Sequence, residues 1–451
     1  MTGRVDPTAQ AAQVVGNTGQ ESEHDYEPTD RAHGGEGDTF HMVLRVDVPP
    51  DLIGGDADEG YGKVADAFRA NFAERHEVGA ALAVYRDGIK VVDLWGGYRN
   101  GVTKAPWQPD TLVNMFSTTK GVAALAVAHA VSAGLLHYDD RVSEHWPEFA
   151  QNGKGEVTVR QLLAHQAGLC ALEPRPTLRD VADSQRLSSI LASQKPAWPP
   201  GTRHGYHAIT IGWYQSELIR RTDPAGRTLG RYLADEITGP LALDVHIGLP
   251  ASVDRDRVAH VHNWKRPESL LHVHEMPLGF LSAALNPVGL TARAVSVPSD
   301  VNAFNGDYNR DEVRVVEIPS ANGTGNARAV AQLYGAAATA DTRLGLTDMT
   351  IAELRAPARN PSGGVRDKVL RVDSEYSLGF CKPFPHFVFG SSNQAFGTPG
   401  FGGSFGFADP ETGIGFAYTM NRLGFHLLSD PRELRLRQAL FTDVLGTRPQ
   451  N

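Results

Sequence analysis

The sequence predicts an α+β fold in which strands from both ends of the chain form one antiparallel sheet. Near the N-terminus, two apolar runs within residues 79–99 flank Asp87-Gly88, a dipeptide that favours a two-residue hairpin turn. Near the C-terminus, two more apolar runs within residues 404–422 flank a second turn. Helical periodicity dominates the intervening chain. We therefore expect an antiparallel sheet flanked by N- and C-terminal helices, plus a mainly helical domain.

The N-terminal region begins with residues 1–37, which are polar and contain few large apolar side chains. Such a segment buries too little surface to offset its ordering entropy, so we expect a disordered tail. The alternating run FHMVLRVDVPP, residues 40–50, predicts the first strand. Val64, Phe68 and Phe72 follow at helical spacing and predict a helix before the hairpin.

The middle of the chain carries the longest apolar helix pattern, at residues 122–136, which we expect to be buried on all sides. Shorter patterns predict further helices: one ending at Gly168, and others near 183–194, 209–221, 327–340 and 431–445. From this order we predict a sheet domain made of residues 38–150 and 311–451. Residues 151–310 would form the helical domain and loops lining a pocket.

Composition and charge exclude several classes of function. The 451 residues include 43 Lys and Arg against 52 Asp and Glu, and a net charge of −9 argues against a nucleic-acid binder. The two cysteines cannot form a disulfide framework, which suits a reducing compartment. No apolar run reaches the roughly 18 residues needed to cross a bilayer. We expect a cytoplasmic protein without membrane or nucleic-acid partners; nothing in the sequence specifies its oligomeric state.

The segment FSTTKG places Ser117 three residues before Lys120 at the start of the apolar helix. One interpretation is an ordinary helix start, because serine is a favoured N-cap residue. The other is a nucleophile beside its base, since residues three apart share a helix face. No Asp, Glu, Lys or Arg follows Lys120 until Asp139, so this turn should enter the core. Burial would lower the lysine pKa and let it accept the serine proton.

Two distant segments could complete such a site. In PPGTRHGYHAIT, Tyr206 stands where a loop meets a helix, and a phenol near a lysine ammonium should ionise more easily and move protons. The alternative is that Tyr206 serves in packing alone. The Gly-rich segment AFGTPGFGGSFGF, residues 395–407, could bring backbone N–H groups close to an oxyanion, or could be a plain turn.

With these three segments in order, the chain over residues 60–446 resembles the serine β-lactamase and penicillin-binding-protein superfamily. Within it, the chain is most similar to class C β-lactamases and family VIII carboxylesterases. FSTTKG matches the S-x-x-K element of that superfamily. GYHAIT stands at the Tyr-x-Asn position, and TPGFGGSFGF stands at the Lys-Thr-Gly element with the strand that follows. The resemblance implies a β-lactamase/transpeptidase-like fold.

The resemblance also implies roles for individual residues. Ser117 would be the acylated nucleophile, and Lys120 and Tyr206 would share the general base and acid steps. The backbone N–H groups of Ser117 and Phe401 would form the oxyanion hole. The substrate would contact the residues at the other motif positions, namely His207, Ala208, Thr398 and Gly400. Such a hydrolase needs no cofactor and no metal, and its partner is a small-molecule ester.

Two positions depart from the superfamily pattern, and both concern the substrate. Ala208 replaces the usual Asn, which removes an amide donor. Thr398 replaces a cationic residue that would bind a carboxylate. These changes favour neutral esters over anionic β-lactams, although Arg203 and His204 lie nearby in the sequence and offer other polar contacts. We therefore predict a carboxylesterase; the alternatives are an acyltransferase or peptide- or β-lactam-processing hydrolase, and a non-catalytic ligand-binding domain.

Three other patterns invite functional interpretations that the sequence does not favour. GGSFG matches the nucleophile-elbow motif at Ser404, but strand residues follow where that motif needs a helix. Histidines near residues 260–275 could bind a metal if they lie on strands, yet a hydrogen-bonded loop is the plainer interpretation. Cys170 and Cys381 lack partner motifs and should be small core residues.

Overall fold

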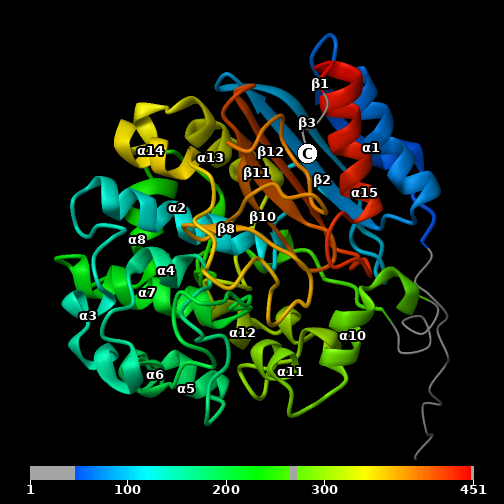
Figure 1. Ribbon diagram of the computed structural model, residues 1–451. Coiled ribbons are helices and arrows are strands. Elements are labelled where there is room, and N and C mark those ends of the chain that lie inside the picture. Colours follow the sequence, from blue (N-terminus) through cyan, green and yellow to red (C-terminus); the bar gives the residue numbers. More distant parts are fainter. Residues whose placement is uncertain (1–45, 265–271, 448–451) are drawn as a thin grey trace, which may run out of the picture. The chain divides into compact units, whose positions relative to one another are not determined.

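The computed structural model describes residues 46–264 and 272–447, all within the second of the two compact units into which the chain divides, Met42–Asn451. The predicted tail, residues 1–37, lies outside the described residues. In the part described, a nine-stranded antiparallel sheet combines strands from both ends of the chain (Figure 1). This arrangement confirms the predicted fold class.

The centre of the sheet joins the two ends directly. Strand β2 (Gly79–Arg86) pairs with β12 (Ile414–Met420) along its whole length, with Ile414 opposite Arg86. The strand order is β1-β3-β2-β12-β11-β10-β9-β8, with β4 paired to β3. The remaining bounds are β1 Ile53–Ala57, β3 Ile89–Asn100, β4 Ala105–Pro106, β8 Tyr376–Ser377, β9 Phe380–Cys381, β10 Phe396–Pro399 and β11 Phe405–Asp409. A separate small sheet has the order β5 (Val113–Asn114), β7 (Thr324–Gly325), β6 (Val245–His246).

Helices cover both faces of the main sheet. Alternate residues of β11 show this: a Cβ on Gly406 would lie 2.7 Å from the ring of Tyr334 in α13 (Ala327–Thr339), whereas the Phe407 ring lies 6.0 Å from that of Phe441. Phe441 belongs to the π-helical turn Ala439–Val444 that continues α15 (Pro431–Gln438). Helix α1 (Gly62–Glu74) packs beside α15, as Figure 1 shows.

The other helices come from the middle of the chain. They are α2 Thr118–Ser132, α3 Val142–His145, α4 Val159–Leu163, α5 Leu178–Ala182, α6 Ser184–Ser193, α7 Thr210–Thr222, α8 Leu229–Leu233, α10 Leu278–Ala284, α11 Leu290–Val295, α12 Asp311–Val315 and α14 Asp348–Arg355. Helix α2 contacts α7, α8 and α14 on one side and strands β9, β10 and β11 on the other. It therefore connects the helical region to the sheet. The division into two domains stays a prediction.

Three predicted boundaries differ from the structure. Residues 40–45 of the predicted first strand lie outside the described residues, and 46–49 form no strand; the first strand is β1, after a 3₁₀ turn at Pro50–Leu52. Consecutive prolines lack the N–H donors that sheet pairing needs. The apolar helix spans Thr118–Ser132 instead of 122–136, because Gly134 takes a positive φ of 72°. The helix expected to reach Gly168 ends at Leu163.

Among the residues that the structure describes, no helix is both long and apolar enough to cross a membrane.

Candidate active site

Ser117 stands immediately before α2, and its hydroxyl does not cap the helix. Its own backbone is already helical, with φ −66° and ψ −13°, and its side chain accepts no bond from the first-turn N–H groups. Phe116 precedes it with φ 46°, a left-handed conformation that costs a non-glycine residue about 1–2 kcal/mol. The hydroxyl instead accepts a hydrogen bond from Lys120 Nζ at 3.0 Å. The geometry thus favours the nucleophile interpretation over the simple cap.

Lys120 is enclosed by the fold, with only 1% of its surface exposed. Its Nζ donates to the carbonyl oxygens of Ala208, at 2.6 Å, and Ser320, at 2.8 Å. Burial lowers the lysine pKa from 10.5 to about 7. In the neutral amine, the two carbonyls accept both N–H bonds and the lone pair points to the Ser117 hydroxyl. A buried amine with a pKa near neutrality, in contact with a hydroxyl, has the chemistry that a general base needs.

Tyr206 lies against the same amine, with Lys120 Nζ 4.7 Å from the centre of its ring. We expected the nearby lysine to make the phenol easier to ionise, and this expectation was wrong. Burial raises the Tyr206 pKa above its ordinary value of 10, and hydrogen bonding with Ser117 offsets only part of that rise. The phenol remains protonated over the working pH range, which suits a proton donor and not a phenolate base.

A buried carboxylate that the sequence analysis missed holds Tyr206 in place. Asp367 Oδ2 accepts the backbone N–H of Tyr206 at 2.9 Å and the hydroxyl of Tyr376 at 3.0 Å. Its Oδ1 accepts the backbone N–H groups of Val369 and Leu370, both at 2.7 Å. The Tyr376 ring stacks on that of Tyr206, with centres 6.0 Å apart. An aspartate that accepts the N–H groups two and three residues later is a recognisable turn pattern. No local signal, however, connects Asp367 to a tyrosine 161 positions away.

His207 does not have the substrate-contacting position that the resemblance implied. Its side chain is fully buried, Nδ1 donates to the carbonyl oxygen of Gly205 at 2.7 Å, and Nε2 accepts the N–H of Leu169 at 2.9 Å. Burial lowers its pKa to about 3, so the ring is neutral. Both nitrogens therefore serve the fold. Ala208 contributes to the site through its carbonyl oxygen on Lys120.

The Gly-rich segment lies against the residues that precede Ser117. A Cβ on Gly400 would lie 2.6 Å from the carbonyl oxygen of Met115, so only glycine permits this approach. Gly400 O accepts the N–H of Gly403 at 3.1 Å, and in a trans peptide the N–H of Phe401 points the opposite way. Within the described residues, the N–H groups of Ser117 and Phe401 donate to no other protein atom. Both are available to a ligand oxygen.

Thr398 and Ser404 face the protein interior. The Thr398 side chain is buried beside Gly121, with its hydroxyl directed toward the hydroxyl of Tyr334. Ser404 donates to the carbonyl oxygen of Met115 at 2.8 Å and is followed by strand β11. Ser404 therefore anchors the chain before Ser117, and the strand confirms that GGSFG is no nucleophile elbow.

The other candidate clusters have ordinary structural surroundings. Among the described residues, no three His, Cys, Asp or Glu side chains are grouped as metal ligands. His262 Nε2 accepts the backbone N–H of Gly101 at 2.9 Å, and His272 is paired with Glu275. Cys381 is buried in β9, and burial raises its pKa to about 12, which makes the thiol unreactive.

Comparison with known proteins agrees with this geometry. The family model described as Beta-lactamase matches residues 64–440. The curated "Esterase/beta-lactamase LipL" of Mycobacterium tuberculosis is 34% identical over 387 residues, which cover 85% of this chain and 87% of LipL. A crystal structure of a family VIII carboxylesterase superposes with a TM-score of 0.75 at 37% identity, covering 86% of this chain and 98% of that one. A crystal structure of a penicillin-binding-protein homologue from Caulobacter crescentus superposes with a TM-score of 0.75 at 39% sequence identity. It covers 86% of this chain and 98% of its own.

The fold and the site define the class of protein: a β-lactamase/transpeptidase-like fold of the type shared by esterase and β-lactamase hydrolases. This chain belongs to the beta-lactamase family.

Proposed function

We propose that the protein is a serine hydrolase that cleaves carboxylic esters through an acyl-enzyme on Ser117. The observation that carries this proposal is the contact of 3.0 Å between Ser117 Oγ and the buried Lys120 Nζ, whose pKa is lowered to about 7. A base with a pKa near the working pH transfers protons most effectively. Cleavage requires no cofactor, because nucleophile, base, acid and oxyanion donors are all protein groups.

In the acylation step, Lys120 takes the hydroxyl proton of Ser117 while Oγ bonds to the ester carbonyl carbon. The carbonyl oxygen becomes an oxyanion, which the N–H groups of Ser117 and Phe401 stabilise. When this intermediate collapses, the bond between the carbonyl carbon and the alcohol oxygen breaks. The leaving alcohol receives a proton from the Tyr206 hydroxyl. The Lys120 ammonium then gives its proton to Tyr206 and becomes neutral again. The products are the free alcohol and the acylated serine.

In the second step, water attacks the acyl carbon and gives its proton to Lys120. The bond to Ser117 Oγ breaks, the carboxylic acid leaves, and the serine recovers a proton from Lys120. An alcohol or amine that enters in place of water would make the same site an acyltransferase. The substrate class rests on the missing cation at position 398, where Thr398 carries no charge that could bind the carboxylate of a β-lactam. The carboxylesterase among the relatives supports the same choice.

The test applies two substrates and one covalent active-site probe to the wild type and to two serine variants. We expect turnover of p-nitrophenyl butyrate, little turnover of nitrocefin, and labelling by a fluorophosphonate probe. Ser117→Ala should lose all three, whereas Ser189→Ala, which changes an exposed serine in α6, should keep them. Unchanged turnover in Ser117→Ala would refute the assignment. Turnover of nitrocefin alone would favour the β-lactamase alternative, and neither turnover nor labelling would favour a ligand-binding domain.

A further inference from the structure

A cavity lies beside the segment that leads into Tyr206. It encloses about 590 Å³ and is lined by the cationic side chains of Arg203, Lys368 and Arg371. Apolar walls come from Trp198 and Leu290, and among the residues that the structure describes no acidic side chain lines the cavity. The chain as a whole has a net charge of −9, so a cavity lined by three cations is opposite in sign to the rest of the protein.

The three cations are not neutralised by the protein. Within the described ranges, none of them forms an ion pair, and the only side-chain bond among them is from Arg203 to the carbonyl oxygen of Gly363. The nearest carboxylate in sequence, Asp367, is buried and occupied by its four donors. Asp373 is paired with a different arginine, Arg366, at 3.5 Å. The charges are therefore free for a ligand.

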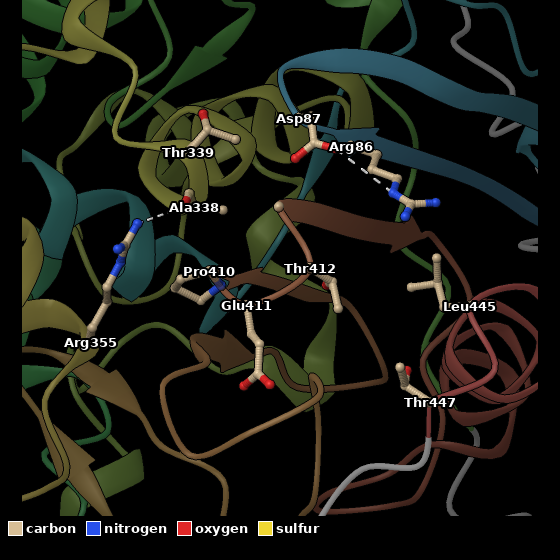
Figure 2. A pocket seen from close by; sticks show the side chains of 11 residues that line it. Arg86, Asp87, Ala338, Thr339, Arg355, Pro410, Glu411, Thr412, Leu445 and Thr447 are labelled. Carbon is tan, nitrogen blue, oxygen red and sulfur yellow. Dashed lines mark hydrogen bonds and ion pairs between the residues drawn. The ribbon is translucent and has the colours of Figure 1, made fainter.

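A cavity of similar size elsewhere in the molecule shows the contrast. It encloses about 530 Å³ at the turn between β11 and β12, at the other end of β11 from Ser404 (Figure 2). Its lining includes both signs of charge: Arg86 pairs with Asp87 at 3.9 Å, and Glu411 is close by in the turn. Arg355 donates to the carbonyl oxygen of Ala338 at 2.9 Å. The two arginines of this cavity are balanced by two carboxylates, whereas the lining of the cavity at Arg203, Lys368 and Arg371 is cationic only.

Backbone hydrogen bonds fix the main chain that carries two of these cations, Lys368 and Arg371. Lys368 N–H donates to the carbonyl oxygen of His204 at 3.0 Å, and Arg371 N–H donates to that of Asp367 at 3.1 Å. Arg371 has a φ of 61°, a left-handed conformation that arginine rarely adopts. Strained residues that the surroundings over-determine cluster at binding sites. The turn at 367–371 is thus a rigid support for two charges.

The same turn supports the candidate catalytic tyrosine. Asp367 accepts the N–H of Tyr206, while the neighbouring Lys368 lines the cavity. A Cβ on Gly205 would lie 2.7 Å from the Trp198 ring and 3.2 Å from Lys368 Cβ. The cavity wall therefore packs closely against Gly205, the residue that immediately precedes Tyr206.

We propose that this cavity binds a small organic anion, a carboxylate or phosphate carried on an apolar or aromatic body. Arginine and lysine bind such groups by charge-assisted hydrogen bonds, and Trp198 and Leu290 would cover the apolar part. The anion belongs either to the ester substrate, in which case the proposal rests on the proposed function, or to a separate molecule bound beside the active site.

Binding is tested by calorimetry on the Ser117→Ala protein, so the result does not depend on turnover. Benzoate is the probe and benzamide its neutral counterpart. We expect benzoate to bind at least tenfold more tightly, and the added changes Lys368→Gln and Arg371→Asn to remove that preference. The matched control is the double variant Lys63→Gln with Lys104→Asn, which removes two positive charges at exposed positions. Lys104 has a φ of 57°, close to the 61° of Arg371, so both Asn substitutions fall on a left-handed backbone.

Equal binding of benzoate and benzamide, or equal loss in both double variants, would overturn the proposal. Circular dichroism and melting temperature verify folding, and Lys368→Gln alone replaces the double variant if that variant does not fold.

The source of the anion is decided with active protein. If the substrate carries it, the cavity variant loses activity on p-nitrophenyl hemisuccinate but not on p-nitrophenyl butyrate. If a separate molecule carries it, benzoate changes butyrate turnover in the wild type and not in the cavity variant. Absence of both effects would refute the link to Tyr206, even where benzoate binds. Absence of any ester turnover, with benzoate binding intact, would count against the proposed function alone.

Discussion

Lys120 Nζ makes three hydrogen bonds, two with the carbonyl oxygens of Ala208 and Ser320 and one, at 3.0 Å, with Ser117 Oγ. Within the described part of the chain, no Asp or Glu side chain pairs with this amine. Its protonated form is therefore disfavoured by burial and stabilised only by neutral oxygens, which is why its pKa lies near 7. The relation between these two residues governs the predictions that follow.

The first prediction concerns pH. Lys120 works as a base only when neutral, so kcat/KM for p-nitrophenyl butyrate should rise tenfold per pH unit below about 7 and level off above it. Because the Tyr206 pKa is raised above 10, the plateau should continue through pH 9. Stopped-flow or steady-state assays from pH 5 to 9 check this. A profile that falls between pH 7 and 9 would contradict these assignments.

The second prediction removes the base. Lys120→Met should lower kcat/KM by about 10²–10⁴-fold, the usual contribution of general acid–base catalysis. Lys154→Met is the matched control, because Lys154 is also a buried lysine held by three carbonyl oxygens, those of Gln151, Ala192 and Gln194. The control should retain activity per folded molecule, as measured by active-site titration. Equal losses in both variants would mean that Lys120 is only structural.

The third prediction removes the phenol hydroxyl. Tyr206→Phe should keep the ring packing against Tyr376 but lower kcat by about 10²-fold or more, since the departing alcohol loses its proton donor. Esters with more acidic alcohols should be less affected, because they leave without a proton. Tyr232→Phe is the comparison, a buried tyrosine hydrogen-bonded to His129. If kcat of Tyr206→Phe falls by the same factor for all leaving groups, Tyr206 does not donate a proton to the departing alcohol.

The fourth prediction displaces the oxyanion donor. The added methyl of Gly400→Ala would meet Met115 O and Ser404 Oγ, so the segment carrying the Phe401 N–H must move. Loss of one such donor costs about 10²–10³-fold in kcat, with a smaller effect on KM. Gly62→Ala adds the same methyl at the start of α1, where no atom lies within 4 Å, and should leave kcat unchanged. Unchanged kcat in Gly400→Ala would exclude this role.

Local patterns in the sequence predicted the parts of the site that depend on neighbours along the chain. The spacing of Ser117 and Lys120 places them on one helical turn, and the two turns at Asp87-Gly88 and after Asp409 define hairpins at the centre of the sheet. The resemblance then connected these segments to distant ones. The ends of strands and helices were predicted less accurately, because they depend on features such as the prolines at 49 and 50 and the positive φ of Gly134.

What the sequence by itself determined is the class of fold and the placement of Ser117 and Lys120 on one helical turn, since hydrophobic periodicity and short motif spacing express local geometry. The tertiary structure alone decided which groups are buried and what faces them. It raised the Tyr206 pKa where a neighbouring charge suggested the reverse, and it used both nitrogens of His207 within the fold. It also brought Asp367 to the backbone of Tyr206. Desolvation and contacts between distant segments have no local signal, because they arise only when the chain has folded.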